Sequence, residues 1–194
     1  SDSYSIRDAN EYFSGAYFWR STDRKAPHNA YISIEKLRSL VARRFVDRPV
    51  RRLASWKFSR GPAKPEGPPA PDLVIDWSTA PYEVRWHFDP DLGQYVRFQG
   101  GEPMKDDDGA VVRAATVVVQ FVKMRVLDEV GRRRITTVGA GRALVATGGR
   151  TVEAAWERKN LAGRTRFLVG EDEVGFAPGA VWIEAVPAAM NIIH

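Results

Sequence analysis

The clearest helical spacing of apolar residues lies in the segment 33–47, where charged residues occupy the rest of the helical wheel. Its apolar positions are Leu37, Leu40, Val41 and Phe45. Ser33 can cap the first turn, Glu35 lies where a negative charge is favourable, and Pro49 cannot continue the helix. The pattern predicts one principal helix in the first part of the chain.

In the second part of the chain the period of the apolar positions changes to two, which is typical of strands with one buried face. In the segment 84–88, apolar residues alternate with Arg85 and His87. Asp89–Gly93 supplies a turn with proline and glycine in suitable places, and the alternation then continues through Gln99. This predicts an antiparallel pair of strands.

Later segments predict further strands. Thr116–Leu127 is predicted as one long strand, apolar on both faces at first and on one face afterwards. Arg142–Thr147 and Arg150–Arg158 flank Gly148-Gly149, a dipeptide typical of a two-residue hairpin turn. A last strand is predicted at Val181–Val186. Short strands with glycine and proline turns favour an antiparallel arrangement.

The predicted fold class is α+β and mainly β, with an antiparallel sheet, sandwich or partly open barrel and one principal helix at about 33–47. Five prolines and two glycines predict an extended linker over residues 61–72. This linker separates residues 1–60 from an antiparallel β domain over residues 73–194. Because a single helix gives residues 1–60 a poor core, we expect them to be the tail of an incomplete N-terminal domain.

The composition of the chain excludes some kinds of chemical site and bears on the kind of partner it could bind. The chain has 194 residues, no cysteine and a formal net charge of +5. Disulfides, thiolate metal sites and cysteine nucleophiles are therefore excluded. The scattered basic residues suit a solvated surface or attraction to polyanions. No nucleic-acid-binding motif accompanies them, so nucleic acid is not an expected partner.

Several short motifs carry a resemblance to a known family. In the first part they are Trp19-Arg20 and the segment 24–31. In the second part they are the segments 84–89, 95–97, 101–103, 117–120, 138–145, 156–158 and 178–183. In this order and spacing, the motifs resemble the YerB-like family of bacterial lipoproteins, whose domains have no known function.

The resemblance implies an extracytoplasmic protein that is tethered to the membrane through a lipidated N-terminus in its full-length form. It also implies two domains, with residues 73–194 as the second. The lipidated cysteine and most of the first domain have no counterpart in this sequence. The family supplies a setting in the cell envelope and no reaction.

The densest polar cluster contains Arg20, Arg24, His28 and Asn29, just before the predicted helix. Guanidinium groups, an imidazole and free helix amides together favour an anion or a peptide carboxylate. The alternative is a structural cluster, in which His28 and Asn29 bond to the backbone and the arginines pair with nearby acids. The sequence leaves both interpretations open.

In the β domain the candidate ligand-binding residues are Trp86, His87 and Arg97. Tryptophans on strands are most often core residues, but one exposed in a groove could stack on a sugar ring. His87 and Asp89 lie two apart, the spacing of an acid–base pair or of two metal ligands. The chain has only three histidines, so a metal site is not expected and a paired surface histidine is favoured.

Two further motifs give no reason to expect a cofactor. Asp106–Gly109 is similar to the start of a calcium loop, but Val117 stands where such a loop has its glutamate. A solvated turn is predicted there instead. Gly139-Ala140-Gly141 opens a strand and not a helix, unlike a dinucleotide-binding fingerprint. No catalytic residue, metal ligand or cofactor is predicted.

These observations support two classes of function. The first is a non-catalytic binding or scaffolding module of the bacterial cell envelope, which acts on an envelope protein or an anionic wall polymer. The second is a hydrolase or transferase whose site, at the interface of the two domains, uses His28 with a carboxylate. A deep pocket with His28 beside a carboxylate would favour the enzyme, and an open groove would favour the binding module.

Overall fold

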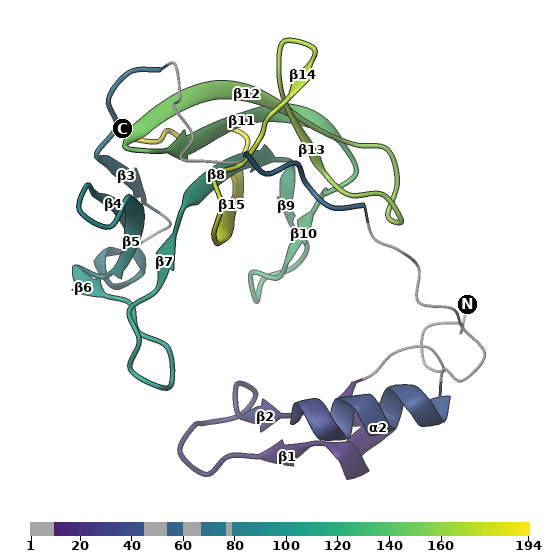
Figure 1. Cartoon of the computed structure of the whole chain (residues 1–194). Coiled ribbons are helices and arrows are strands. Elements are labelled where there is room, and N and C mark those ends of the chain that lie inside the picture. Colours follow the sequence, from purple (N-terminus) through teal and green to yellow (C-terminus); the bar gives the residue numbers. More distant parts are fainter. Residues whose placement is uncertain (1–9, 45–53, 60–66, 77–78) are drawn as a thin grey trace. The chain divides into compact units, whose positions relative to one another are not determined.

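The computed structural model describes residues 10–44, 54–59, 67–76 and 79–194. The chain divides into two compact units, Ser1–Arg52 and Leu53–His194 (Figure 1). Within the described ranges the longest helix has 11 residues, so none has the length and apolar character needed to cross a bilayer.

The first unit is small and built around one helix. Its elements are α1 (Glu11–Ser14), the 3-10 turn η1 (Gly15–Tyr17), β1 (Trp19–Arg20), β2 (Ala30–Tyr31) and α2 (Ile34–Arg44). β1 and β2 pair antiparallel, and the rings of Trp19 and Tyr31 stack with their centroids 6.1 Å apart. The unit leaves Tyr12 and Phe13 exposed.

Helix α2 confirms the predicted helix. The Ser33 hydroxyl accepts a hydrogen bond from the Lys36 amide at 3.2 Å, as an N-cap does. Hydrogen bonds to its own backbone amide and to Ser33 lower the pKa of Glu35. Leu40 is fully buried. The last predicted turn, 45–47, lies outside the described residues.

The second unit contains a smaller antiparallel sheet in the strand order β3-β4-β5-β6, with β7 also paired to β5. Its elements are β3 (Asp72–Ile75), the 3-10 turn η2 (Ala80–Tyr82), β4 (Val84–Asp89), β5 (Gln94–Gln99), β6 (Glu102–Pro103) and β7 (Arg113–Ala114). The turn at Asp89–Gly93 joins β4 to β5 as predicted, and the Asp89 carboxylate accepts hydrogen bonds from the amides of Asp91 and Leu92.

The larger sheet has the strand order β14-β13-β12-β11-β8-β15. These strands are β8 (Thr116–Val122), β11 (Gly139–Thr147), β12 (Arg150–Arg158), β13 (Arg166–Val169), β14 (Asp172–Glu173) and β15 (Val181–Pro187). A separate two-stranded hairpin, β9 (Met124–Val126) with β10 (Arg133–Ile135), projects from the end of β8 (Figure 1).

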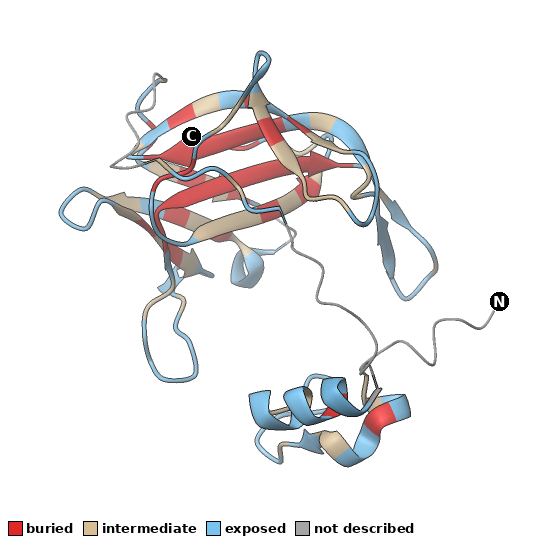
Figure 2. Ribbon diagram, turned by 45° about the vertical axis from the view of Figure 1, so that its right-hand side comes forward, coloured by how far each residue is buried: buried red, intermediate tan, exposed pale blue. Residues whose placement is uncertain are grey.

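The two sheets form an open sandwich around a shared apolar core. One core cluster joins Trp86 and Tyr95 of the smaller sheet to Val117, Val119 and other residues of the larger sheet. A second cluster, with Val118 and Phe167 among its members, covers the opposite face of the larger sheet. Every residue of β8 is therefore buried, and red strands run through the middle of the larger sheet in Figure 2.

The mainly β α+β fold class is confirmed, with two corrections of detail. β15 runs parallel to β8, whereas all strands were predicted antiparallel. The predicted long strand Thr116–Leu127 is interrupted at Lys123, where β8 ends and the projecting hairpin begins. The Lys123 carbonyl there accepts from the amide of Thr136, so the chain changes its pairing partner at this residue.

The Gly148-Gly149 hairpin is confirmed. β11 and β12 pair antiparallel from Thr147↔Arg150 to Gly139↔Arg158. Both glycines have positive φ, 56° and 72°, which the primed hairpin turns require. At Gly149 an added Cβ would also lie 2.7 Å from the Phe88 ring, so the turn packs too closely for a side chain.

The described residues of the predicted linker, and those just before it, pack against the β unit. Ala70 is fully buried, and its amide donates to the Gly149 carbonyl at 2.8 Å. Trp56 lies against Phe167 and Phe176, with ring centroids 6.4 and 5.5 Å away. Residues 54–59 therefore cover part of the second core cluster.

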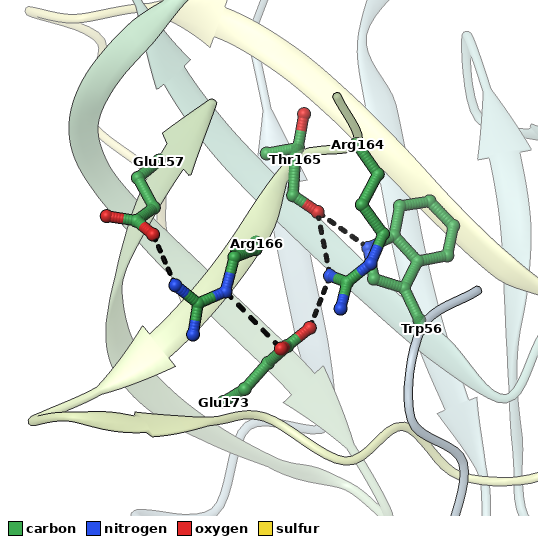
Figure 3. Close-up of polar contacts among 6 residues, drawn as sticks. All are labelled: Trp56, Glu157, Arg164, Thr165, Arg166 and Glu173. Atoms are coloured by element: carbon green, nitrogen blue, oxygen red, sulfur yellow. Dashed lines mark hydrogen bonds and ion pairs between the residues drawn. The ribbon is translucent and has the colours of Figure 1, made fainter. Parts of the chain in front are cut away.

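A network of polar contacts lies beside the same segment (Figure 3). The Trp56 indole donates to the Thr165 carbonyl at 2.8 Å, and the neighbouring Arg164 forms an ion pair with Glu173. Arg166 bridges Glu173 at 3.4 Å and Glu157 at 2.5 Å. The hydrogen bond from Arg164 lowers the pKa of Glu173 more than its partial burial raises it.

We expect Glu173→Gln to lower the free energy of unfolding at neutral pH. We also expect the stability of the variant to fall less than that of the wild type as the pH is lowered. A carboxylate whose folded-state pKa is lowered stabilises the fold above its ordinary pKa of 4.5, and this contribution is lost as the pH falls through the folded-state value. Urea unfolding at pH 7 and at about pH 3 should show the wild type and the variant converging in acid. Asp172→Asn, an exposed neighbour on β14, is the control and should change stability by less than about 0.5 kcal/mol.

Candidate functional site

A pocket of about 290 Å³ opens where β8 ends, at the base of the β9–β10 hairpin. Its wall comes from the end of β8 with the residue after it, the segment just before β11, the start of β11, one residue of β12 and the residue that follows β15. The lining residues are Phe121, Lys123, Thr136, Val138, Gly139, Ala140, Gly141, Arg142, Trp156 and Ala188. We call this the β11 pocket.

Trp156 forms the buried side of the β11 pocket. Only 2% of its surface is exposed, and its indole N–H donates to the Phe121 carbonyl at 2.8 Å. Gly141 lies directly opposite Trp156 in the ladder, and a Cβ there would be 2.7 Å from the indole nitrogen and 3.0 Å from the Phe121 oxygen. Glycine is therefore required for the indole to reach its acceptor.

Two cations give the β11 pocket its charge. The Arg142 guanidinium lies over the Phe121 ring, 3.9 Å from the centroid. Lys123 is exposed at the point where β8 gives way to the hairpin. The described lining contains no carboxylate, so an oxyanion is the ligand group that this lining favours.

The predicted cluster in the first unit is only partly brought together. Arg20 donates to the Asn29 side-chain oxygen at 2.6 Å and to both Glu11 carboxylate oxygens at 2.8 Å. The Asn29 amide donates to the Ser21 carbonyl at 3.0 Å. These contacts are those of the structural interpretation, because Arg20 already has a carboxylate partner.

His28 and Arg24 lie on the exposed loop between β1 and β2. In the described part of the chain, no contact joins the His28 side chain to a carboxylate, the arrangement that the hydrolase interpretation requires. Anion binding by the four predicted residues stays a prediction.

Trp86 and Arg97 lie inside the sandwich. Trp86 is fully buried, so it is not available to stack on a sugar ring, and its indole donates to Glu184 at 3.1 Å. The Arg97 Nε lies 3.6 Å from the same carboxylate, and the guanidinium is 5.3 Å from the Trp182 ring centroid. Both charged side chains are about nine-tenths buried. They form an internal ion pair between β5 and β15.

His87 pairs with Asp72 and not with Asp89. The His87 Nδ1 lies 2.9 Å from the Asp72 carboxylate on the neighbouring strand, with both side chains partly exposed. The Asp89 carboxylate is used by the turn that follows it. His87 is therefore a paired surface histidine, the interpretation favoured from the sequence, and it forms no acid–base pair with Asp89. The described residues contain no group of three potential metal ligands.

The β11 pocket could not be predicted from local patterns, because its lining residues are far apart in the sequence. Lys123 was predicted in mid-strand, and Arg142 was predicted only as the start of a strand. The available signal was Gly139-Ala140-Gly141, since glycines inside a strand indicate close approach of another group. Here that group is Trp156.

The fold and the site define a mixed β-sandwich protein with a small cationic pocket. Residues 73–183 match the family described as "Protein of unknown function (DUF3048) C-terminal domain", and the chain belongs to this family. The family resemblance seen in the sequence motifs is thereby confirmed.

Two further comparisons agree with this assignment. The chain is 25% identical over 178 residues to a protein of Bacillus subtilis (strain 168) named "Putative lipoprotein YerB", covering 90% of this chain and 53% of that protein. It also matches a crystal structure of YerB from Bacillus subtilis with a TM-score of 0.73 and 23% identity. That match covers 92% of this chain and 60% of the other. The chain thus spans about half the length of its curated relative.

Proposed function

We propose that this chain is an extracytoplasmic binding module of the bacterial cell envelope, and that its β11 pocket holds an anionic group of an envelope polymer or protein. The observation that carries the proposal is the pair of cations, Lys123 and Arg142, in a described lining without a carboxylate. The name of the curated relative supports the envelope setting, in which the full-length protein is tethered by a lipid.

The geometry favours binding over chemistry. A reaction on the bound group would need a nucleophile or a general base within reach of it. The one hydroxyl in the described lining is that of Thr136, and no histidine or carboxylate of this lining accompanies it. The formal net charge of +5 adds long-range attraction for a polyanion.

Inorganic pyrophosphate and citrate are the probes for the β11 pocket, because the first presents phosphate groups and the second presents carboxylate groups. Calorimetric titration should show that Arg142→Gln weakens binding of the preferred anion about tenfold, the expected cost of a lost charge-assisted hydrogen bond. Lys123→Gln should also weaken binding of the preferred anion, because it removes the other cation of the pocket.

Arg85 offers a matched control. Its guanidinium lies 4.6 Å from the centroid of the Phe98 ring, and both residues belong to the smaller sheet. Arg85→Gln therefore removes one positive charge and one cation–ring contact, as Arg142→Gln does, but outside the β11 pocket. We expect this variant to bind as the wild type does. Equal losses in Arg85→Gln and Arg142→Gln, or no binding of either anion to the wild type, would contradict the proposal.

A further inference from the structure

Two arginines face each other across the β9–β10 hairpin. Arg125 of β9 is the direct partner of Arg134 of β10, and both side chains are exposed. Like charges at directly opposite positions of an antiparallel pair destabilise it, so the hairpin carries an unfavourable contact. An anion between the two guanidiniums would turn this repulsion into two charge-assisted hydrogen bonds.

The same face of the hairpin leads to the β11 pocket. The hydrogen bond from the Thr136 amide to the Lys123 carbonyl extends the ladder by one pair beyond Met124↔Ile135. Because side chains alternate along a strand, Lys123 and Thr136 fall on the face of the two arginines, about 7 Å farther along. Both Lys123 and Thr136 line the β11 pocket.

The opposite face of the hairpin has a different character. It holds the apolar pair Met124↔Ile135 and, beside it, Val126 opposite Arg133. The remaining arginine of the turn, Arg132, is neutralised by Asp128 at 2.6 Å. Among the described residues no carboxylate forms an ion pair with Arg125 or Arg134, so the cationic face is available to a ligand.

We propose that Arg125 and Arg134 form a second anion-binding position, and that the ligand is a linear polymer whose phosphate or carboxylate groups repeat. One group would occupy the β11 pocket and another would lie between the two arginines. This inference rests on the proposed function of the β11 pocket, because the hairpin arginines extend that site. A ligand with a single anionic group would gain nothing from them.

The test compares a short and a long probe on two matched variants. The probes are pyrophosphate and long-chain polyphosphate, with poly-L-glutamate as the carboxylate counterpart. Arg134→Gln removes one arginine of the opposed pair, and Arg133→Gln removes the same charge from the other face of the same strand. Affinity is measured by calorimetric titration, and ligand-free stability by thermal unfolding.

We expect Arg134→Gln to weaken binding of the preferred polymer about tenfold and to leave pyrophosphate binding unchanged. Arg133→Gln should weaken polymer binding by less than about twofold, the effect of a rim charge. Without ligand, Arg134→Gln should melt at or above the wild-type temperature, because a repulsive pair is removed.

Equal losses of polymer affinity in the two variants would show diffuse attraction only and overturn the inference. A polymer that binds no more tightly than pyrophosphate would also overturn it, while pyrophosphate binding that depends on Arg142 would leave the β11 pocket intact. Failure of pyrophosphate and citrate to bind the wild type is the separate result that defeats the proposed function.

Discussion

Replacing Glu184 by glutamine should destabilise the protein by about 3–5 kcal/mol, the cost of leaving a buried charge without its partner. Glu184 and Arg97 are each about nine-tenths buried between the sheets, and Glu184 also accepts from the Trp86 indole. Glutamine keeps the size of the side chain and removes the charge that neutralises Arg97. Urea unfolding of the variant and the wild type measures the difference.

An exposed ion pair provides the control. Glu157 and Arg166 are 2.5 Å apart, but the two side chains are 32% and 41% exposed, so Glu157→Gln should cost less than about 1 kcal/mol. The double variant Arg97→Leu with Glu184→Leu should be more stable than Glu184→Gln alone, because it leaves no buried charge. If Glu184→Gln lowered the free energy of unfolding by less than about 1 kcal/mol, the charge of Glu184 would not be needed to neutralise Arg97.

Replacing Trp156 by alanine should cost about 3–5 kcal/mol and abolish anion binding in the β11 pocket. The indole is nearly fully buried, packs with the second core cluster and fills the space beside Gly141. Its removal leaves a cavity beside Gly141 and frees the Phe121 carbonyl. Thermal and urea unfolding, followed by circular dichroism, measure the loss.

Trp156→Phe separates the packing of the indole from its hydrogen bond. Phenylalanine keeps an aromatic ring but leaves the Phe121 carbonyl without its donor, which should cost about 1–3 kcal/mol. Anion binding should persist in this variant, since Lys123 and Arg142 are unchanged. Wild-type stability of Trp156→Ala would contradict the role assigned to this residue.

Much of the fold could be predicted because strands and tight turns are encoded locally. The Gly148-Gly149 hairpin and the Asp89–Gly93 turn follow from residue types within a few positions. The parallel pairing of β15 with β8 could not be predicted in this way. Alternation shows which face of a strand is apolar, but it does not show the direction of the neighbouring strand.

The candidate site was harder to predict because burial depends on distant elements. Alternation places Arg97 on the face of Tyr95, but only the second sheet makes that face an interior and supplies Glu184 as its partner. His87 likewise pairs with the carboxylate of Asp72 on β3 and not with a carboxylate of its own strand. The β11 pocket depends on Gly141, which brings the Trp156 indole to the end of β8.

The most direct test of anion binding in the β11 pocket is a nuclear magnetic resonance titration of the wild-type chain with long-chain polyphosphate and, separately, poly-L-glutamate. We predict that one of these polymers shifts the amide signals of Thr136, Gly141 and Arg142 and the indole signal of Trp156, together with amides of the β9–β10 hairpin. Signals of the Arg20–Asn29 loop should move far less. The largest shifts in that loop, or shifts spread evenly over the surface, would contradict the assignment of the β11 pocket as the binding site.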